Sequence, residues 1–419
     1  YQTPSDMFAL GGVRFLGAVE GALQQLYATQ INREMAEMSD LPFLRLPLPP
    51  NPNAVPFQPD VIAGTFAAAL DDLEGSLSAL DTITDADSVS VTINTADLWF
   101  DINANGTREA GEGMLEVAAS QLNRRLEGTL TPPVVRFDTS DAAWLSAYAH
   151  LLSGVSETIL ALDPTSAIQR VTESAAAMEA LNDGGRQMIF MPEEDTWIDV
   201  IAMFVHAIEG QPDVERSRNA HAHFLGMIAD NQTFWSRVAT ETDNKLEWIP
   251  NPNQTSVLPL EFPADIGSQW RMVLAEAEAV LKGDLLIPHW RLGNGAGINL
   301  AKAMQDPPEI DVIAIIQGEG VLPYLEEGTR MSGRSLTQFQ RSPVAGWQLR
   351  QRRDDDGVNQ TIDRFVDAMV LDMNLQFAAI QPAQDIDQIA RRGAKEAVIV
   401  PIDTKEAPQQ SFRRESLPD

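Results

Sequence analysis

The sequence predicts a mainly α-helical protein: an antiparallel helical assembly with a smaller α+β part at the C-terminal end. Long segments in the first 245 residues repeat apolar residues at alternating steps of three and four, which is the spacing of one helix face. Most of the short apolar runs typical of strands follow residue 245. The chain of 419 residues is 44% hydrophobic and 21% charged, an ordinary globular composition.

The predicted helices of the first part are amphipathic and separated by short polar breaks. In one of them, Phe66, Leu70 and Leu73 begin an apolar stripe that continues to Leu80. The segments with this periodicity are 5–38, 60–81, 141–162, 165–182, 194–209 and 215–241. Short breaks between consecutive helices favour antiparallel neighbours, so we expect these helices to pack side by side.

Two proline-rich connectors interrupt this pattern, at residues 41–59 and 248–263. Proline lacks the N–H that a helix interior needs, so both connectors are predicted to be extended. Each contains the sequence Pro-Asn-Pro-Asn, at 50–53 and 250–253, followed by an aspartate before a predicted helix. This echo has two interpretations, an internal duplication or two turns that arose separately.

The second part of the chain mixes helices and strands. The predicted helices are 265–282, 297–304 and 361–377, and the predicted strands are 284–292, 310–316 and 398–402, with one earlier strand at 88–94. The prediction is therefore an α-rich domain at 1–245, an α+β part at 246–403 and a C-terminal tail at 404–419.

Charge and composition exclude several classes of function. Sixty acidic and thirty basic residues give a formal net charge of −30, which argues against binding of nucleic acid or an anionic membrane. Without cysteine the chain has no disulfide, thiolate metal site or cysteine nucleophile. No apolar run is long enough to predict a transmembrane helix. Acidity favours a periplasmic or extracellular location, and the first residue, Tyr1, is compatible with removal of a signal peptide.

One segment, residues 101–112, carries a pattern with clear chemistry. Alternate oxygen-bearing side chains can converge on one cation as the backbone curls, and Gly106 permits the sharp turn that this requires. The predicted metal ligands are the side chains of Asp101, Asn103 and Asn105, the backbone carbonyl of Thr107, Glu109 directly or through water, and both carboxylate oxygens of Glu112. Calcium takes six to eight hard oxygen ligands, so the predicted ion is Ca²⁺.

This spacing resembles the calcium loop of an EF-hand, and the resemblance is confined to these twelve residues. Position eight, usually aliphatic, is Arg108, no second loop is found, and a strand-like segment precedes the loop. The segment is therefore more similar to the solitary calcium loops of many exported bacterial proteins. That resemblance implies a structural ion and, because cytosolic calcium is scarce, an exported protein. An Asn-Gly-rich turn without metal is the alternative.

Histidines give a weaker signal. His221 and His223 are two apart on a predicted helix and point in different directions, so they cannot share an ion there. A metal site between helices would make the protein a metal-dependent hydrolase, and its ligands would be His150, Glu157, Asp199 and His206. No His-Glu-x-x-His or Glu-x-x-His motif supports this site, so structural roles are favoured for the histidines.

Several tryptophans gather in the later half of the chain and are predicted either to line a cleft for a small solute or to lie in the core: Trp235, Trp248, Trp270, Trp290 and Trp347. The leading interpretation is an exported, calcium-stabilised, non-catalytic protein that binds a protein partner or a small solute. The alternatives are the metal-dependent hydrolase and a structural or assembly protein that makes contacts through its connectors and tail.

Overall fold

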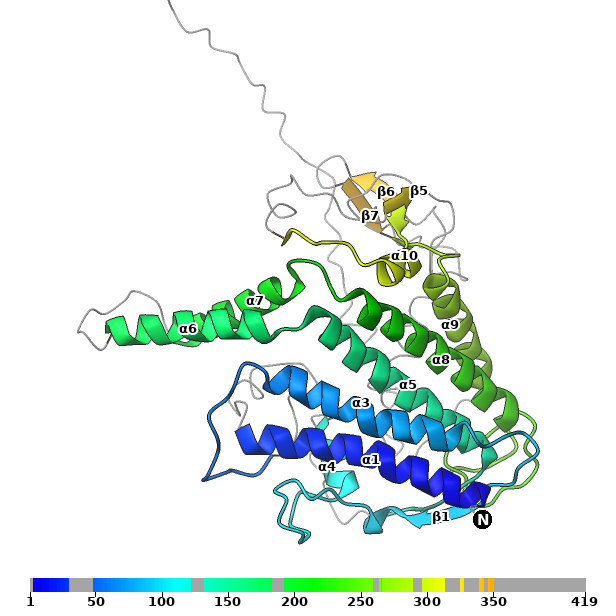
Figure 1. Ribbon diagram of the computed structural model, residues 1–419. Helices are drawn as coiled ribbons and strands as arrows, with labels where there is room; N and C mark the ends of the chain where they lie inside the picture. Colours follow the sequence, from blue (N-terminus) through cyan, green and yellow to red (C-terminus); the bar gives the residue numbers. More distant parts are fainter. Residues whose placement is uncertain are drawn as a thin grey trace, which may run out of the picture. The chain divides into compact units, whose positions relative to one another are not determined.

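The structure is a computed structural model and describes residues 3–29, 48–121, 132–182, 192–258, 264, 266–288, 296–312, 325–327, 339–342 and 346–349 (Figure 1). Judged by its internal contacts, the chain divides after Pro382, and every described residue belongs to the first unit, Tyr1–Pro382. The described residues are mainly helical, as predicted. The predicted helix 361–377, strand 398–402 and tail 404–419 lie outside the described residues.

Four long helices form the main helical layer: α1 (Pro4–Thr29), α3 (Val61–Leu80), α5 (Thr139–Leu162) and α8 (Val214–Val238). Each packs along the next, α1 on α3, α3 on α5 and α5 on α8, and their directions alternate (Figure 1). Ala18 of α1, Leu73 of α3 and Ala149 of α5 are buried in one shared cluster. The antiparallel arrangement predicted from short connections is therefore confirmed for these helices.

The remaining helices also match the apolar periodicity. They are α4 (Met114–Gln121), α6 (Thr165–Asn182), α7 (Pro192–Ile208), α9 (Ile266–Leu281) and α10 (Leu300–Gln305), with one 3₁₀ turn, η2 (Thr95–Asp97). α6 packs against α7, and α9 packs against α8. α10 begins three residues later than the predicted helix 297–304, because its first residues belong to a strand.

Strands are few and short. β1 (Val91–Asn94) pairs antiparallel with β2 (Val134–Phe137), and Val91 lies opposite Phe137. The sequence pattern does not predict β2, because four residues after two prolines are too short to show an alternation. The later strands are β3 (Ile287–Pro288), β4 (Ala296–Ile298) and β5 (Leu325–Glu327), antiparallel in that order, and the hairpin of β6 (Phe339–Ser342) and β7 (Gly346–Leu349).

The largest hydrophobic cluster crosses the predicted domain boundary at residue 245. Ile228 and Phe234 of α8 share this cluster with Trp248 and Ile249, which follow the boundary, and with Leu274 of α9. The change of character near residue 245 is therefore a change of secondary structure, and the packing of the described residues continues across it. Of the predicted strand 310–316 only 310–312 are described, and there Ile310 forms an isolated bridge with Gly210.

Helix α5 contains a long apolar window with few charged residues. By length and composition alone it is the one described helix that qualifies as a candidate membrane span. It packs against both α3 and α8, and half of its most apolar window is buried within the fold. Its apolar side chains thus have helix neighbours, as in the core helix of a globular domain.

The two Pro-Asn-Pro-Asn connectors form the same hydrogen bonds. In each, the N–H of the second asparagine donates to Oδ1 of the first at 2.9 Å. The side-chain amide of the first asparagine donates to a carbonyl near the end of the preceding long helix, Asn51 to Tyr27 of α1 at 3.1 Å and Asn251 to Val238 of α8 at 2.9 Å. The repeated sequence therefore also has a repeated hydrogen-bonding pattern. One copy lies in the connector from α1 to α3, and the other lies in the connector from α8 to α9.

Candidate metal centre

The predicted calcium loop, residues 101–112, is closed at its base by a short antiparallel ladder. Phe100 N–H donates to the carbonyl of Glu112 at 2.8 Å, and Met114 N–H donates to that of Leu98 at 3.0 Å. The chain enters the loop after η2 and leaves it directly into α4. The loop thus has an exit helix but lacks the entering helix of an EF-hand.

The carboxylate of Asp101 organises the first half of the loop. Its Oδ1 accepts the N–H of Asn105 at 2.9 Å, and its Oδ2 accepts the N–H of Gly106 at 2.8 Å. The backbone turns through positive φ at Ala104 (55°) and Gly106 (73°). Glycine adopts this conformation without a steric penalty, so Gly106 forms the sharp turn that was predicted from its position.

The two asparagines and Glu109 form the centre of the loop. Asn103 Oδ1 accepts from the N–H of Asn105 at 3.1 Å, and Asn105 Oδ1 accepts from the N–H of Thr107 at 2.7 Å. Both side-chain amides donate to Glu109, Asn103 to Oε2 at 3.0 Å and Asn105 to Oε1 at 2.9 Å. The side-chain oxygens predicted to bind calcium at these three positions are thus joined in one hydrogen-bonded network.

Glu112 closes the loop from its last position and is only 1% exposed. Its Oε1 accepts the N–H of Ile102 at 3.1 Å, and its Oε2 accepts the N–H of Glu109 at 2.7 Å. The carboxylate therefore folds back onto the beginning of the loop. A buried carboxylate is costly unless its charge is compensated, and here two N–H donors and any cation in the loop provide that compensation.

Helix α1 holds the loop through two polar side chains that sequence reasoning missed. Glu20 Oε2 accepts the N–H of Asp101 at 2.9 Å, and Gln24 Nε2 donates to the carbonyl of Asp101 at 2.8 Å. Glu20 and Gln24 are four residues apart and so share one helix face. This spacing is the feature of the sequence that indicates a shared contact. Below them, Leu23 of α1 packs with Ile102 in a buried apolar cluster.

Arg108 explains one departure from the EF-hand pattern. At the position where a paired loop carries an aliphatic residue, the guanidinium of Arg108 donates to the carbonyl of Ala96 at 2.6 Å. This contact ties the loop to η2 of its own chain, so a second loop has no role at this position. The arrangement fits a solitary loop.

A second group of carboxylates, which we call the acidic cluster, consists of Asp138, Glu241 and Glu247. Of the described residues, these are the ones in which three metal-ligating side chains bring one atom each within 4.8 Å of one another. Asp138 caps α5, where its Oδ1 accepts from Ser140 N at 2.8 Å. Ser140 Oγ donates to Glu241, and the N–H of Lys245 donates to Glu247 at 2.6 Å.

Burial and repulsion between like charges raise the pKa values of two carboxyl groups of the acidic cluster. Removal from water raises the pKa of Glu241, and the charge of Asp138 adds to the rise. Burial likewise raises the pKa of Glu247, with the charges of Asp243 and Asp138 acting in the same direction. Asp141, the other half of the α5 capping box, is fully buried beside them, and its pKa is raised well above its ordinary value, mainly by burial.

The ligands predicted for a hydrolase are not gathered into one metal-binding group among the described residues. Glu157 accepts from Arg216 at 3.0 Å, and His206 lies 3.1 Å from Glu209. His150 instead faces His223, at 2.9 Å between the two Nδ1 atoms. His221 is buried with its Nε2 2.6 Å from the carbonyl of Leu281, which is the structural role expected of it.

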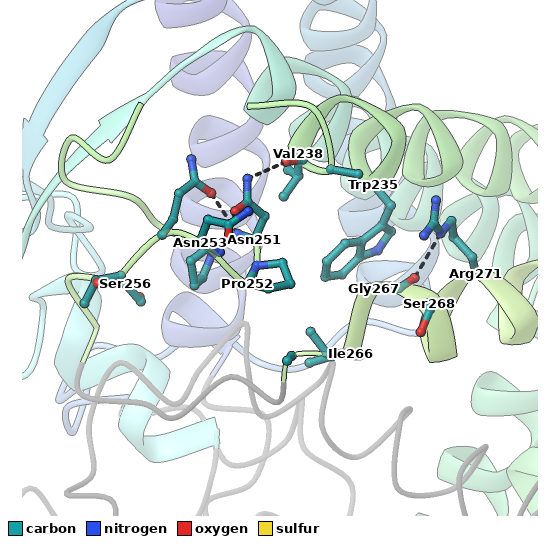
Figure 2. Close-up of a pocket in the computed structure, with 15 residues that line it drawn as sticks. Trp235, Val238, Asn251, Pro252, Asn253, Ser256, Ile266, Gly267, Ser268 and Arg271 are labelled. Carbon is teal, nitrogen blue, oxygen red and sulfur yellow. Dashed lines mark hydrogen bonds between the residues drawn. The ribbon is translucent and has the colours of Figure 1, made fainter. Parts of the chain in front are cut away.

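A pocket of about 540 Å³ lies between the C-terminal end of α8, the second connector and the start of α9. Figure 2 shows Trp235 and Arg271 on one side and Asn251 and Pro252 of the connector on the other. Arg271 is exposed, and its Nε donates to the carbonyl of Gly267 at 3.2 Å. The volume and the mixed polar and aromatic lining suit a small solute.

Among the described tryptophans that were predicted to line a cleft, Trp248 and Trp270 do not line this pocket. Trp248 is buried in the core against Phe137 and Trp144. Trp270 Nε1 donates to Asn231 at 2.8 Å. Trp290 lies outside the described residues, and the side chain of Trp347 in β7 is not described.

Comparisons with known proteins do not assign the chain to a family. No model of a known protein family, no curated protein and no solved structure matches it. The candidate site is therefore identified by the geometry and chemistry of its own residues alone.

Proposed function

We propose that residues 101–112 bind one calcium ion, and that this ion stabilises the fold of an exported, non-catalytic protein that binds a small solute or a protein partner. The observation that carries the proposal is the network of hydrogen bonds that joins Asp101, Asn103, Asn105, Glu109 and Glu112 in one loop around the turn at Gly106. Carboxylate and amide oxygens in this order are the ligands that calcium prefers.

The loop is placed where a bound ion affects the stability of the fold. Asp101 is hydrogen-bonded through its backbone to Glu20 and Gln24, so an ordered loop is coupled to α1. An ion that binds only the folded state stabilises it by mass action, by about 2.7 kcal/mol at a free concentration one hundred times its dissociation constant. Extracellular calcium is high enough to fill a weak solitary site, which supports export.

The test is a calorimetric titration of chelator-treated full-length protein with calcium. We expect one ion per chain and a rise in Tm of several degrees, and loss of both in Asp101→Ala. Asp97→Ala is the matched control, because Asp97 is an exposed aspartate four residues earlier that the loop geometry does not use. Absence of heat and of any Tm shift in the wild type contradicts the proposal.

A second control separates the loop from the acidic cluster. Glu247→Gln removes one of the three carboxylates that lie within 4.8 Å of one another and keeps the shape of the side chain. We expect the calcium titration of this variant to match that of the wild type. Loss of binding in Glu247→Gln with retention in Asp101→Ala moves the ion to the acidic cluster and overturns the proposal.

The solute-binding part of the proposal rests on the pocket beside Trp235 (Figure 2). Because the indole lines the pocket, a bound solute is expected to change tryptophan fluorescence. We propose a screen of small carboxylates and sugars, with Trp235→Phe to remove the signal and Arg271→Ala to weaken binding. A response that both variants retain places the solute elsewhere.

A further inference from the structure

Two histidine rings face each other across the contact between α5 and α8. The Nδ1 atom of His150, on α5, lies 2.9 Å from the Nδ1 atom of His223, on α8. The ring centroids are 5.1 Å apart, with an interplanar angle of 52°. The rings are partly buried, with intermediate exposure, between helices that pack along their length (Figure 1). Two imidazole nitrogens that point at one another share either a proton or a cation.

The surroundings of His150 favour one tautomer of its ring and so determine which ring nitrogen has the lone pair. Its Nε2 lies 3.8 Å from Asp230 Oδ2, and that oxygen accepts from Ser146 Oγ at 2.6 Å. The carboxylate favours the tautomer in which Nε2 carries the hydrogen, so the lone pair of His150 is on Nδ1 and points at His223. In the metal-free state the Nδ1–H of His223 donates to this lone pair.

A histidine whose far nitrogen faces a carboxylate is the arrangement that metal-binding histidines use. Across 3.8 Å, which is longer than a hydrogen bond, Asp230 acts on the ring through its charge and raises the basicity of the nitrogen that binds the metal. Metal–nitrogen distances of about 2.0–2.1 Å place two imidazole nitrogens of one ion about 3.3 Å apart, a few tenths of an ångström more than the separation here. Both rings must rotate so that the two lone pairs converge on the ion.

Gly226 of α8 makes the room that His150 occupies. A Cβ at this position would lie 2.9 Å from Cε1 and Nε2 of the His150 ring. Any larger residue would therefore displace the ring from its place between Asp230 and His223. The position of the imidazole is set by its neighbours on α8 as well as by its own helix.

We propose that His150 and His223 bind a divalent first-row transition-metal ion through their Nδ1 atoms, with Asp230 as a positioning residue. Binding requires His223 to change tautomer: its Nδ1 gives its proton to solvent and its Nε2 takes one up, so both rings remain neutral and each Nδ1 donates its lone pair to the ion. Among the described residues no third histidine or acid brings a ligand atom within 4.8 Å of both. The remaining positions take water or an exogenous ligand, which makes this an open site.

The site is chemically distinct from the calcium loop. Imidazole nitrogen prefers zinc, copper or nickel, whereas calcium requires oxygen ligands. Zinc is the probe of choice for affinity, and cobalt(II), whose visible absorption reports its ligands, is the probe for coordination.

The test is a titration of full-length protein with Zn²⁺ in saturating calcium, so that the loop does not compete. We expect one zinc ion per chain, lost in His150→Ala and in His223→Gln. His206→Ala is the matched control, because His206 is also partly buried but contacts Arg170 and Glu209. Asp230→Asn is expected to weaken zinc binding about tenfold and to change the cobalt spectrum, as a positioning residue should.

The two histidines lie on different helices, so each can be replaced separately and the two variants are separate tests of the site. If His150→Ala fails to fold, His223→Gln, which keeps a polar side chain at a partly exposed position, still decides the question. Zinc binding that survives in both variants, or a wild type that binds no zinc and gives no cobalt absorption, overturns the proposal. Failure of the calcium titration leaves this result untouched, since the residues and the ion are different.

Discussion

Residues 101–112 and the acidic cluster each bring several carboxylates together. The carboxylates of the loop come from one short segment, whereas those of the cluster come from segments far apart in the sequence. In the loop, Asp101 and Glu112 use all four carboxylate oxygens to accept backbone N–H groups from their own twelve-residue segment. In the acidic cluster, Asp138 meets Glu241 and Glu247 from a segment about one hundred residues away. The loop is thus a local structure held by hydrogen bonds within one segment, and the cluster arises where a helix cap meets the segment that follows α8.

This difference predicts different responses to substitution. Removal of Glu112 leaves the N–H groups of Ile102 and Glu109 without acceptors, the first of them buried, and removal of a loop carboxylate is expected to weaken calcium binding. In the cluster, loss of one charge relieves repulsion between neighbours whose pKa values are already raised by burial. The two regions are therefore distinguished by the calcium dependence of the effect and, at Glu247, also by its sign.

The largest effect is expected for Glu112→Ala. The N–H groups of Ile102 and Glu109 lose their acceptor, so we expect the free energy of unfolding to fall by about 3 kcal/mol in chelator, with no recovery in calcium. Urea unfolding with and without calcium measures this. Glu116→Ala, an exposed position just beyond the loop, is the control, and an equal effect in the two variants contradicts the assigned role of Glu112.

A smaller loss is expected for Asp138→Ala. Asp138 caps α5, so its removal should lower the free energy of unfolding by about 1 kcal/mol, with the calcium-dependent part of the stability unchanged. Asp138→Asn, which keeps a capping oxygen, should recover most of the loss in thermal denaturation. A variant that loses its response to calcium would identify the cluster, and not the loop, as the calcium site.

The smallest effect, of opposite sign, is expected for Glu247→Gln. The raised pKa of Glu247 means that the folded state binds a proton more tightly than the unfolded state. That contribution to stability is complete below the ordinary glutamate pKa and is lost as pH rises through the folded-state value. The neutral variant should therefore have a Tm about 2 °C higher than that of the wild type at pH 7.5. At pH 4 the two proteins should have the same Tm.

Thermal denaturation as a function of pH checks this last prediction, with Glu116→Gln as an exposed control. An equal gain in the two variants would attribute the effect to net charge. A gain that persists unchanged at pH 4 would contradict a role for protonation.

How much sequence reasoning predicts depends on how far apart the interacting residues are. The loop ligands lie within twelve consecutive residues, so their spacing alone predicts them. Glu20 and Gln24 are about eighty residues from Asp101, and only the docking of α1 brings them to the loop. The helices are predicted well because their apolar periodicity is local, whereas β2 has no such pattern.

The histidines show the same limit in another way. His221 and His223 cannot share an ion on one helix, and the structure agrees, because their rings point to different partners. The sequence predicts a partner for His150 on the helix of His206, but the packing of α5 on α8 places His223 beside it. The spacing of residues in the sequence predicts which side chains share a helix face. Which element packs against that face depends on the tertiary fold, and the spacing does not predict it.

The most direct test of the central claim is a crystal structure of the protein grown in calcium, with anomalous data to locate the ion. The account predicts one strong peak inside residues 101–112, about 2.3–2.6 Å from oxygens of Asp101, Asn103, Asn105 and Glu112. A peak at Asp138, Glu241 and Glu247 with none in the loop, or a loop that remains without an ion at millimolar calcium, would contradict it.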